Sequence, residues 1–156
     1  MQTIKQKVLF LNASPKDLYG IYLNSAKHTA LSGSPARISS REGADFSAHG
    51  TYISGKNSCL VPDRLIVQTW RAENWGPADP DSTFILMMEQ KGKDTILHMV
   101  HAGVPDREAD ELLKGWQFYY WEPMKKMLEA SRKKGSPKSG SRRKSSVRKV
   151  VPKKRK

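Results

Sequence analysis

The residue types that could carry out catalysis or bind a metal are few and poorly spaced in this chain. His98 and His101 lie three residues apart, which on a strand puts their side chains on opposite faces and argues against a shared metal site. Cys59 is the only cysteine, so no internal disulfide and no cysteine pair for zinc can form. Neither a phosphate-binding glycine loop nor a nucleophile elbow occurs. We therefore expect no catalytic residue, no metal and no cofactor.

Aromatic and sulfur-containing side chains are the stronger candidates for function. Some of them share a strand face with His101 or Gln68, the two polar groups that could orient a ligand. Others form an apolar stripe on the predicted C-terminal helix. An apolar lining with a few polar groups is typical of small-molecule pockets, although a helix packed on a sheet also explains such residues. The predicted ligand-binding residues are Gln68, Trp70, Leu86, Met88, Met99, His101, Trp116, Tyr119, Tyr120 and Met124.

The first elements that must position these side chains are a strand and two short helices. Alternating apolar residues predict a strand over 3–12. Ser14 and Asp17 form the Ser-x-x-Asp pattern of a capping box, and Pro15 suits the first helical position. A second short helix is predicted over 25–31, before Gly33 and a proline.

The remaining elements are short strands followed by one long helix. Residues 36–104 alternate strand-like segments with turn residues, and 82–90 and 95–104 are predicted to form a hairpin. After Pro105, apolar residues recur at steps of three and four, with Pro123 expected to kink or divide the helix. An antiparallel sheet with one long helix packed on it is an α+β fold. The predicted stripe comprises Leu113, Trp116, Tyr120, Met124 and Met127.

A set of short motifs also occurs in order along residues 18–128. They are Gly50-x-x-x-x-Gly55, Leu60-Val61-Pro62, Ile66-Val67-x-x-Trp70-Arg71, Trp75, Thr95-x-Leu97-x-Met99, Gly103-Val104-Pro105 and Gly115-Trp116-x-x-Tyr119-Tyr120. Together they resemble the family named for activators of the heat shock protein 90 ATPase, within the START-like (SRPBCC) superfamily. The resemblance implies a helix-grip fold, in which a curved antiparallel sheet wraps around a long C-terminal helix and leaves a cavity between them.

The same resemblance bears on function. In the eukaryotic activators this domain follows a separate N-terminal domain that makes the principal chaperone contact. A chain that begins at the domain itself is therefore expected to bind a small apolar or amphipathic ligand. The alternative is a protein-interaction module that stimulates the heat shock protein 90 ATPase as a co-chaperone.

The net charge of +13 is concentrated at the C-terminus. Residues 132–156 hold 13 basic and no acidic residues, which leaves 15 basic and 15 acidic residues in 1–131. We expect a START-like domain over 1–131 and a disordered basic tail over 132–156. A second alternative function is nonspecific nucleic-acid association through this tail. The candidate contacts are Arg142, Arg143, Lys144, Lys153, Lys154 and Arg155.

Location and oligomeric state complete the expectations. The sequence has no segment of about 20 apolar residues and no signal peptide, which predicts a cytoplasmic protein without membrane contact. The outward positions of the predicted hairpin are apolar rather than polar. A monomer or a weak homodimer is therefore expected, with a patch of Ile85, Met87, Ile96, His98 and Val100.

Overall fold

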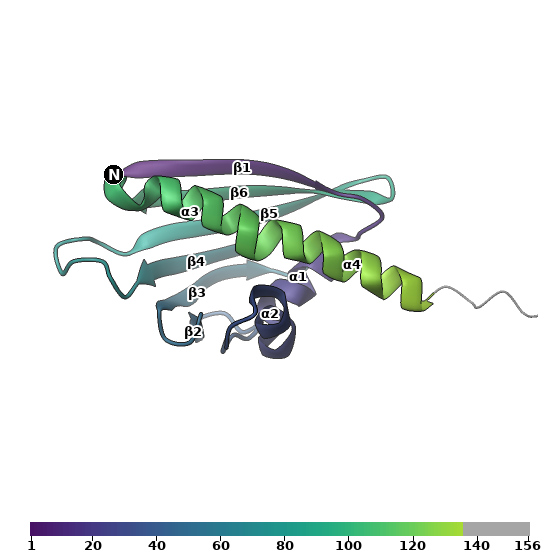
Figure 1. Ribbon diagram of the computed structural model, residues 1–156, viewed down its shortest axis with the longest axis horizontal. Helices are drawn as coiled ribbons and strands as arrows, with labels where there is room; N and C mark the ends of the chain where they lie inside the picture. The colour runs from purple at the N-terminus through teal and green to yellow at the C-terminus, as the bar shows by residue number, and fades with distance from the viewer. Residues whose placement is uncertain (136–156) are drawn as a thin grey trace, which may run out of the picture.

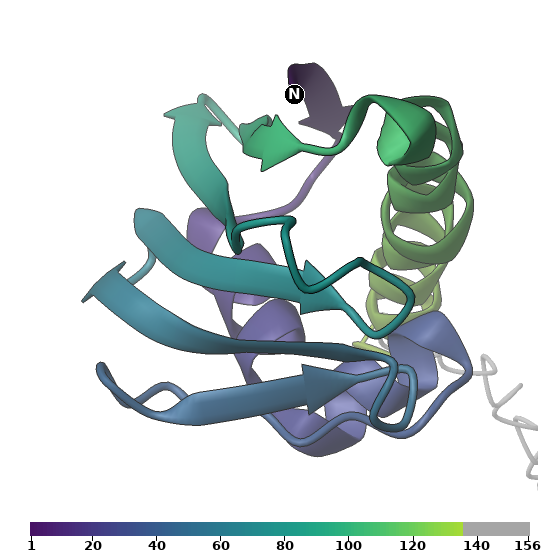
Figure 2. The same ribbon diagram turned by 90° about the vertical axis from the view of Figure 1, so that its left-hand side faces the viewer.

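Six antiparallel strands form one curved sheet in the computed structural model, which describes residues 1–135 (Figures 1 and 2). The sheet order is β1-β6-β5-β4-β3-β2, so β1 reaches the far edge beside the last strand. The predicted hairpin is the β5–β6 pair. The strands are β1 (Gln2–Phe10), β2 (Asp45–Ala48), β3 (Ile53–Val61), β4 (Leu65–Ala72), β5 (Ser82–Lys91) and β6 (Asp94–Val104).

The helices of residues 1–135 all cover the same face of this sheet (Figure 2). Two short helices, α1 (Pro15–Leu23) and α2 (Ser25–Ser32), follow β1. A short 3-10 turn (Asp106–Glu108) leads into a long helical segment that crosses the sheet (Figure 1). This segment consists of α3 (Ala109–Trp116), a π-helical turn (Gln117–Trp121) and α4 (Glu122–Gly135). The predicted α+β helix-grip architecture, with two short helices after the first strand, is confirmed.

The short helices begin where the sequence signals predict. Ser14 Oγ accepts a hydrogen bond from the Asp17 amide at 3.1 Å, and Asp17 Oδ2 accepts one from the Ser14 amide at 3.1 Å. This reciprocal pair satisfies two amides that have no partner inside the helix. Asn24 caps α2 through the Lys27 amide, and Gly33 ends it in the left-handed conformation at φ 74°. Only glycine adopts that conformation without steric cost.

The long helix is divided at Pro123, as expected, but by a π turn rather than by a break. Pro123 has no amide hydrogen, and its ring would clash with the carbonyl four residues earlier in a regular α-helix. The wider turn relieves this conflict, since the Glu122 amide bonds the Gln117 carbonyl five residues back. The turn contains four consecutive aromatic residues, 118–121, of which two are exposed and two are buried. Phe118 and Tyr119 are 70% and 45% exposed, whereas Tyr120 and Trp121 are buried.

Gln6 of β1 braces this turn from the sheet side. The Gln117 amide bonds the Lys114 carbonyl only three residues back. The carbonyl of Leu113 instead accepts a hydrogen bond from Gln6 Nε2 at 3.1 Å. The indole Nε1 of Trp121 donates to Gln6 Oε1 at 2.6 Å. One side chain thus satisfies a carbonyl that precedes the π turn and the indole of the last residue in the turn.

Two expectations about the long helix need correction. Leu113 is 41% exposed and Met127 only partly buried, because the helix buries residues at steps of four through the π turn rather than at mixed steps. The buried row is Leu112, Trp116, Tyr120, Met124 and Leu128, of which Leu112 is partly covered.

The second correction concerns the predicted boundary at residue 131. The helix continues to Gly135, since lysine and arginine form helices well and suit the negative C-terminal end. Arg132 Nη1 also donates to the Leu11 carbonyl at 3.1 Å. The tail residues proposed for nucleic-acid binding, from Arg142 to Arg155, lie outside the described residues. Within residues 1–135, none of the helices combines the length and apolar character that a membrane span requires.

Gly55 offers a test of how tightly β3 packs. A Cβ atom there would overlap the Thr69 carbonyl oxygen and lie 2.6 Å from Phe46 Cε1. We expect Gly55→Ala to lower the free energy of unfolding by about 1–3 kcal/mol in urea titrations. The control is Gly20→Ala in α1, where no atom lies within 4 Å and the change should stabilise by up to about 1 kcal/mol. Equal unfolding midpoints for the two variants would contradict this packing.

Candidate binding groove and the buried face behind it

Most of the residues predicted to line a ligand pocket pack against one another. Trp116 stacks on Phe84 with ring centroids 4.3 Å apart and an interplanar angle of 12°. Such offset stacking adds to the stability gained by burying the rings. Only Tyr119 among the ten predicted residues is exposed. The other nine are buried, namely Gln68, Trp70, Leu86, Met88, Met99, His101, Trp116, Tyr120 and Met124.

His101 is held by hydrogen bonds on both ring nitrogens. The Ser82 hydroxyl donates to the Trp70 carbonyl at 2.7 Å, so its oxygen accepts from His101 Nε2 at 2.8 Å. The indole Nε1 of Trp116 donates to His101 Nδ1 at 3.2 Å. This pattern fits the neutral imidazole, and burial lowers the pKa of His101 to about 4. His101 therefore links the sheet to the long helix as a satisfied core group.

Gln68 belongs to a second buried network. Its Oε1 accepts from the Tyr22 hydroxyl at 3.1 Å, and its Nε2 donates to Asn57 Oδ1 at 2.9 Å. Asn57 Nδ2 in turn donates to the carbonyls of Ser39 and Arg41. The network connects α1, β3, β4 and the loop that precedes β2. Sequence reasoning missed Asn57, because its hydrogen-bond partners come from distant segments of the chain.

A third polar chain reaches the surface beside the long helix. His28 Nδ1 donates to the Tyr22 carbonyl at 2.8 Å, which leaves Nε2 to accept from the Tyr120 hydroxyl at 3.1 Å. The Tyr120 hydroxyl oxygen also lies 3.3 Å from Nε2 of His49, whose side chain is half-buried. Burial lowers the pKa of both histidines, so both are neutral near pH 7. The sequence gave no signal for His28 or His49, because their contacts span distant segments.

A groove opens where this chain meets solvent. It has a volume of about 300 Å³ and lies between the β2–β3 loop and the start of the long helix. Its floor is formed by buried rings, and its rim by Tyr52 and Tyr119, which are 41% and 45% exposed. The lining residues are His49, Tyr52, Ile53, Trp70, Glu108, Glu111, Leu112, Gly115, Trp116, Tyr119 and Tyr120.

The groove gathers part of the predicted site into one place. Trp70, Trp116, Tyr119 and Tyr120 line it, whereas Gln68 and His101 lie behind its floor. Gly115, singled out for its position in a helix, also lines it. Residues 1–135 contain no group of three or more His, Cys, Asp or Glu side chains that could hold a metal ion. The accessible surface of the groove is mainly aromatic, with the carboxylates of Glu108 and Glu111 at one end.

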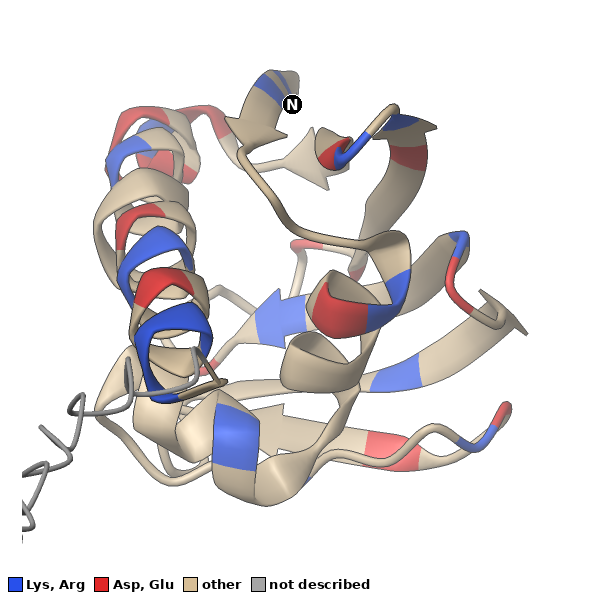
Figure 3. Cartoon of the chain, turned by 90° about the vertical axis from the view of Figure 1, so that its right-hand side faces the viewer, with Lys and Arg blue, Asp and Glu red and all other residues tan. Residues whose placement is uncertain are grey.

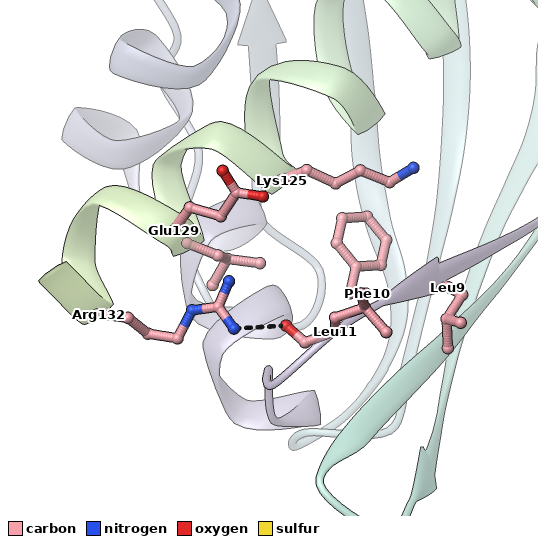
Figure 4. A pocket seen from close by; sticks show the side chains of 7 residues that line it. Leu9, Phe10, Leu11, Lys125, Glu129 and Arg132 are labelled. Atoms are coloured by element: carbon pink, nitrogen blue, oxygen red, sulfur yellow. Dashed lines mark hydrogen bonds between the residues drawn. The ribbon is translucent and has the colours of Figure 1, made fainter.

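A smaller cleft lies between the end of β1 and α4 (Figure 4). Its volume is about 120 Å³, and Leu9, Leu11 and Leu128 give it an apolar wall. The hydrogen bond from Arg132 to the Leu11 carbonyl closes one side. Acidic and basic residues are interspersed along the helix above it (Figure 3). This cleft is too small for most ligands, whose pockets measure about 300–1,000 Å³.

The outer face of the sheet is apolar along its centre. Ile85 pairs with Val100, and Met87 pairs with His98. All four side chains point away from the core and are partly or largely exposed, as the strand alternation predicts. Val67 extends the row through its pairing with Ile85. No helix among residues 1–135 covers this face (Figure 2).

The buried histidine predicts a specific pH dependence of stability. In the unfolded chain His101 titrates near 6.5, and in the folded chain near 4. Between pH 6.5 and 4 the imidazole is protonated in the unfolded state but neutral in the folded state. The free energy of unfolding therefore falls as the pH decreases toward 4. We expect His101 to contribute a loss of about 3 kcal/mol over that window. When the free energy of unfolding from urea titrations is plotted against pH, His101→Gln should show a smaller decrease between pH 6.5 and 4 than the unsubstituted chain. Identical slopes would contradict the assignment.

Sequence comparison places residues 12–129 in a known family. They match the family model described as Activator of Hsp90 ATPase homolog 1-like protein. The "Activator of 90 kDa heat shock protein ATPase homolog" of Dictyostelium discoideum is 34% identical over 117 residues, covering 74% of this chain and 30% of that protein. The human homolog 1 is 32% identical over 123 residues, covering 79% and 35%. The chain thus spans about a third of the length of these relatives.

Solved structures share the same fold. An HSP90 activator from Plasmodium falciparum superposes with a TM-score of 0.73 at 22% identity, over 81% of this chain and 96% of that one. The Aha1 dimer from Colwellia psychrerythraea gives a TM-score of 0.63 at 13% identity, over 76% and 90%. At these identities the structures establish the fold alone. Taken with the match over residues 12–129, the chain belongs to the Activator of Hsp90 ATPase homolog 1-like protein family.

Proposed function

We propose that this chain is a protein-interaction module that acts on the ATPase of a heat shock protein 90 chaperone. The support is family membership together with relatives named as activators of that ATPase. Because the chain spans about a third of those relatives, the activity of the whole proteins is carried over here as a hypothesis. A co-chaperone role therefore ranks ahead of small-ligand binding, and a cytoplasmic location follows from such a partner.

The observation on this molecule that favours protein binding is the outward display of aromatic rings by the π turn. Phe118 and Tyr119 project from the long helix next to the groove, and Tyr52 lies across it. Large aromatic side chains are enriched in protein interfaces and dominate their binding energy. The buried face behind them is filled by the chain's own side chains. A partner would therefore meet the rim rather than the interior.

The direct test is ATPase stimulation of heat shock protein 90 from the organism that encodes the chain. We expect the chain to raise the hydrolysis rate in a saturable manner. Phe118→Ala combined with Tyr119→Ala should raise the half-saturating concentration by about tenfold or more, the effect of losing an interface anchor. The matched control is Leu11→Ala, a similarly exposed apolar side chain that follows the end of β1 and lies outside the groove. No stimulation and no complex at any ratio would exclude the proposal.

A small amphipathic ligand is the second candidate function, favoured by the groove itself. Its volume of about 300 Å³ is at the lower end of small-molecule pockets. Its floor of Trp70, Trp116 and Tyr120 is apolar, and the hydroxyl and imidazole groups at its rim offer hydrogen bonds. A ligand bound there would stabilise the chain without any chaperone present.

Weak self-association is the second proposed interaction, and the apolar outer face supports it. The solved relative from Colwellia psychrerythraea is described as a dimer. Sedimentation equilibrium should show a mass that increases with concentration, because burying this row removes apolar surface from water. Ile85→Glu combined with Met87→Lys should abolish the increase, while Leu11→Ala should leave it unchanged. A concentration-independent monomer mass of the unsubstituted chain would exclude a homodimer.

A further inference from the structure

We propose that the groove binds an arginine side chain of the partner protein. The identity of that partner depends on the function proposed above, but the chemistry of the groove does not. The groove combines aromatic walls, two carboxylates and a volume that exceeds one side chain. Guanidinium groups pair with carboxylates and stack on aromatic rings, which makes arginine the best match among the side chains.

The charge of the lining is negative. Glu108 and Glu111 contribute carboxylates, and none of the lining residues is lysine or arginine. His49 adds no positive charge near pH 7, since burial lowers its pKa. Glu108 is partly engaged, with Arg107 Nε at 3.6 Å and Asn74 Nδ2 at 3.4 Å. Among residues 1–135, Glu111 takes part in no ion pair, so its charge is available to a bound cation.

The aromatic walls lie within reach of the same charge. Burial and then the carboxylates of Glu108 and Glu73 raise the pKa of Tyr52, which places its ring in a negative field. Tyr119 lies on the opposite rim and contacts His49 edge-on, with centroids 5.4 Å apart. A cation between these rings would face electron-rich surfaces and carboxylates together. Such contacts contribute about 0.5–2 kcal/mol depending on desolvation.

Helix stabilisation alone does not account for this arrangement. Four acidic residues lie at the start of the long helix, where negative charge suits the helix dipole. Any position in the first turns would serve that purpose. Glu108 and Glu111 are three residues apart and therefore share one side of the helix, and that side faces the groove. Asp106 is instead paired with the N-terminal ammonium of Met1.

The test compares two peptides that differ only in charge. Acetyl-glycyl-arginyl-glycinamide and its citrulline counterpart are titrated into the isotopically labelled chain, and the indole signals of Trp70 and Trp116 are followed by NMR. We expect the arginine peptide to shift these signals with a dissociation constant about tenfold lower than that of the citrulline peptide. Equal affinities, or no shift with either peptide, would overturn the inference.

Substitutions then locate the charge that matters. Glu108→Gln combined with Glu111→Gln should remove the preference for arginine over citrulline. Glu129→Gln, on the same helix but outside the groove, should retain it. A preference that survives the double substitution would overturn the inference as well. Because no chaperone is present, arginine binding without ATPase stimulation would exclude only the proposed function, whereas stimulation without arginine binding would exclude only the groove's role.

Discussion

The packing of Trp116 against the inner face of the sheet is the contact on which the rest of the molecule depends. Its ring stacks on Phe84 from β5, and its indole nitrogen bonds His101 from β6. Through Ser82 the same chain of hydrogen bonds reaches the backbone of β4. One side chain of the long helix is thus joined to three central strands. The helix lies where this contact holds it, and the groove forms beside it.

This contact also explains why a partner can reach the rim of the groove but not the space between helix and sheet. Large rings fill the space between helix and sheet, and the polar groups there are satisfied by one another. The space between helix and sheet is filled by side chains, and the groove beside it is lined by aromatic rings. Rigidity benefits protein recognition, because side chains held in place lose less entropy on binding. The polar chain from His28 through Tyr120 fixes one wall of that groove.

Much of the fold follows from local patterns in the sequence. Strand alternation assigned Leu86, Met99 and Trp70 to the inner face correctly, and the Ser14 capping box located α1. The groove was harder to predict because its walls come from three distant segments, namely the β2–β3 loop near His49, β4 at Trp70, and the long helix from Glu108 to Tyr120. Nothing in the local pattern of one segment specifies the others. Tyr119 lies outside the buried row of the helix, and the π turn that contains it is not visible in the apolar spacing.

The π turn has a consequence for how relatives of this chain are compared. A widened turn accommodates one residue more than a regular α-helix of the same length. Gln6 bonds the Leu113 carbonyl before the turn and the Trp121 indole at its last residue, and the additional residue lies within 117–121. An alignment with a relative whose helix is regular should therefore place a one-residue gap there. Without that gap, the residues on one side of the turn would be matched one position out of register with the buried row of the helix.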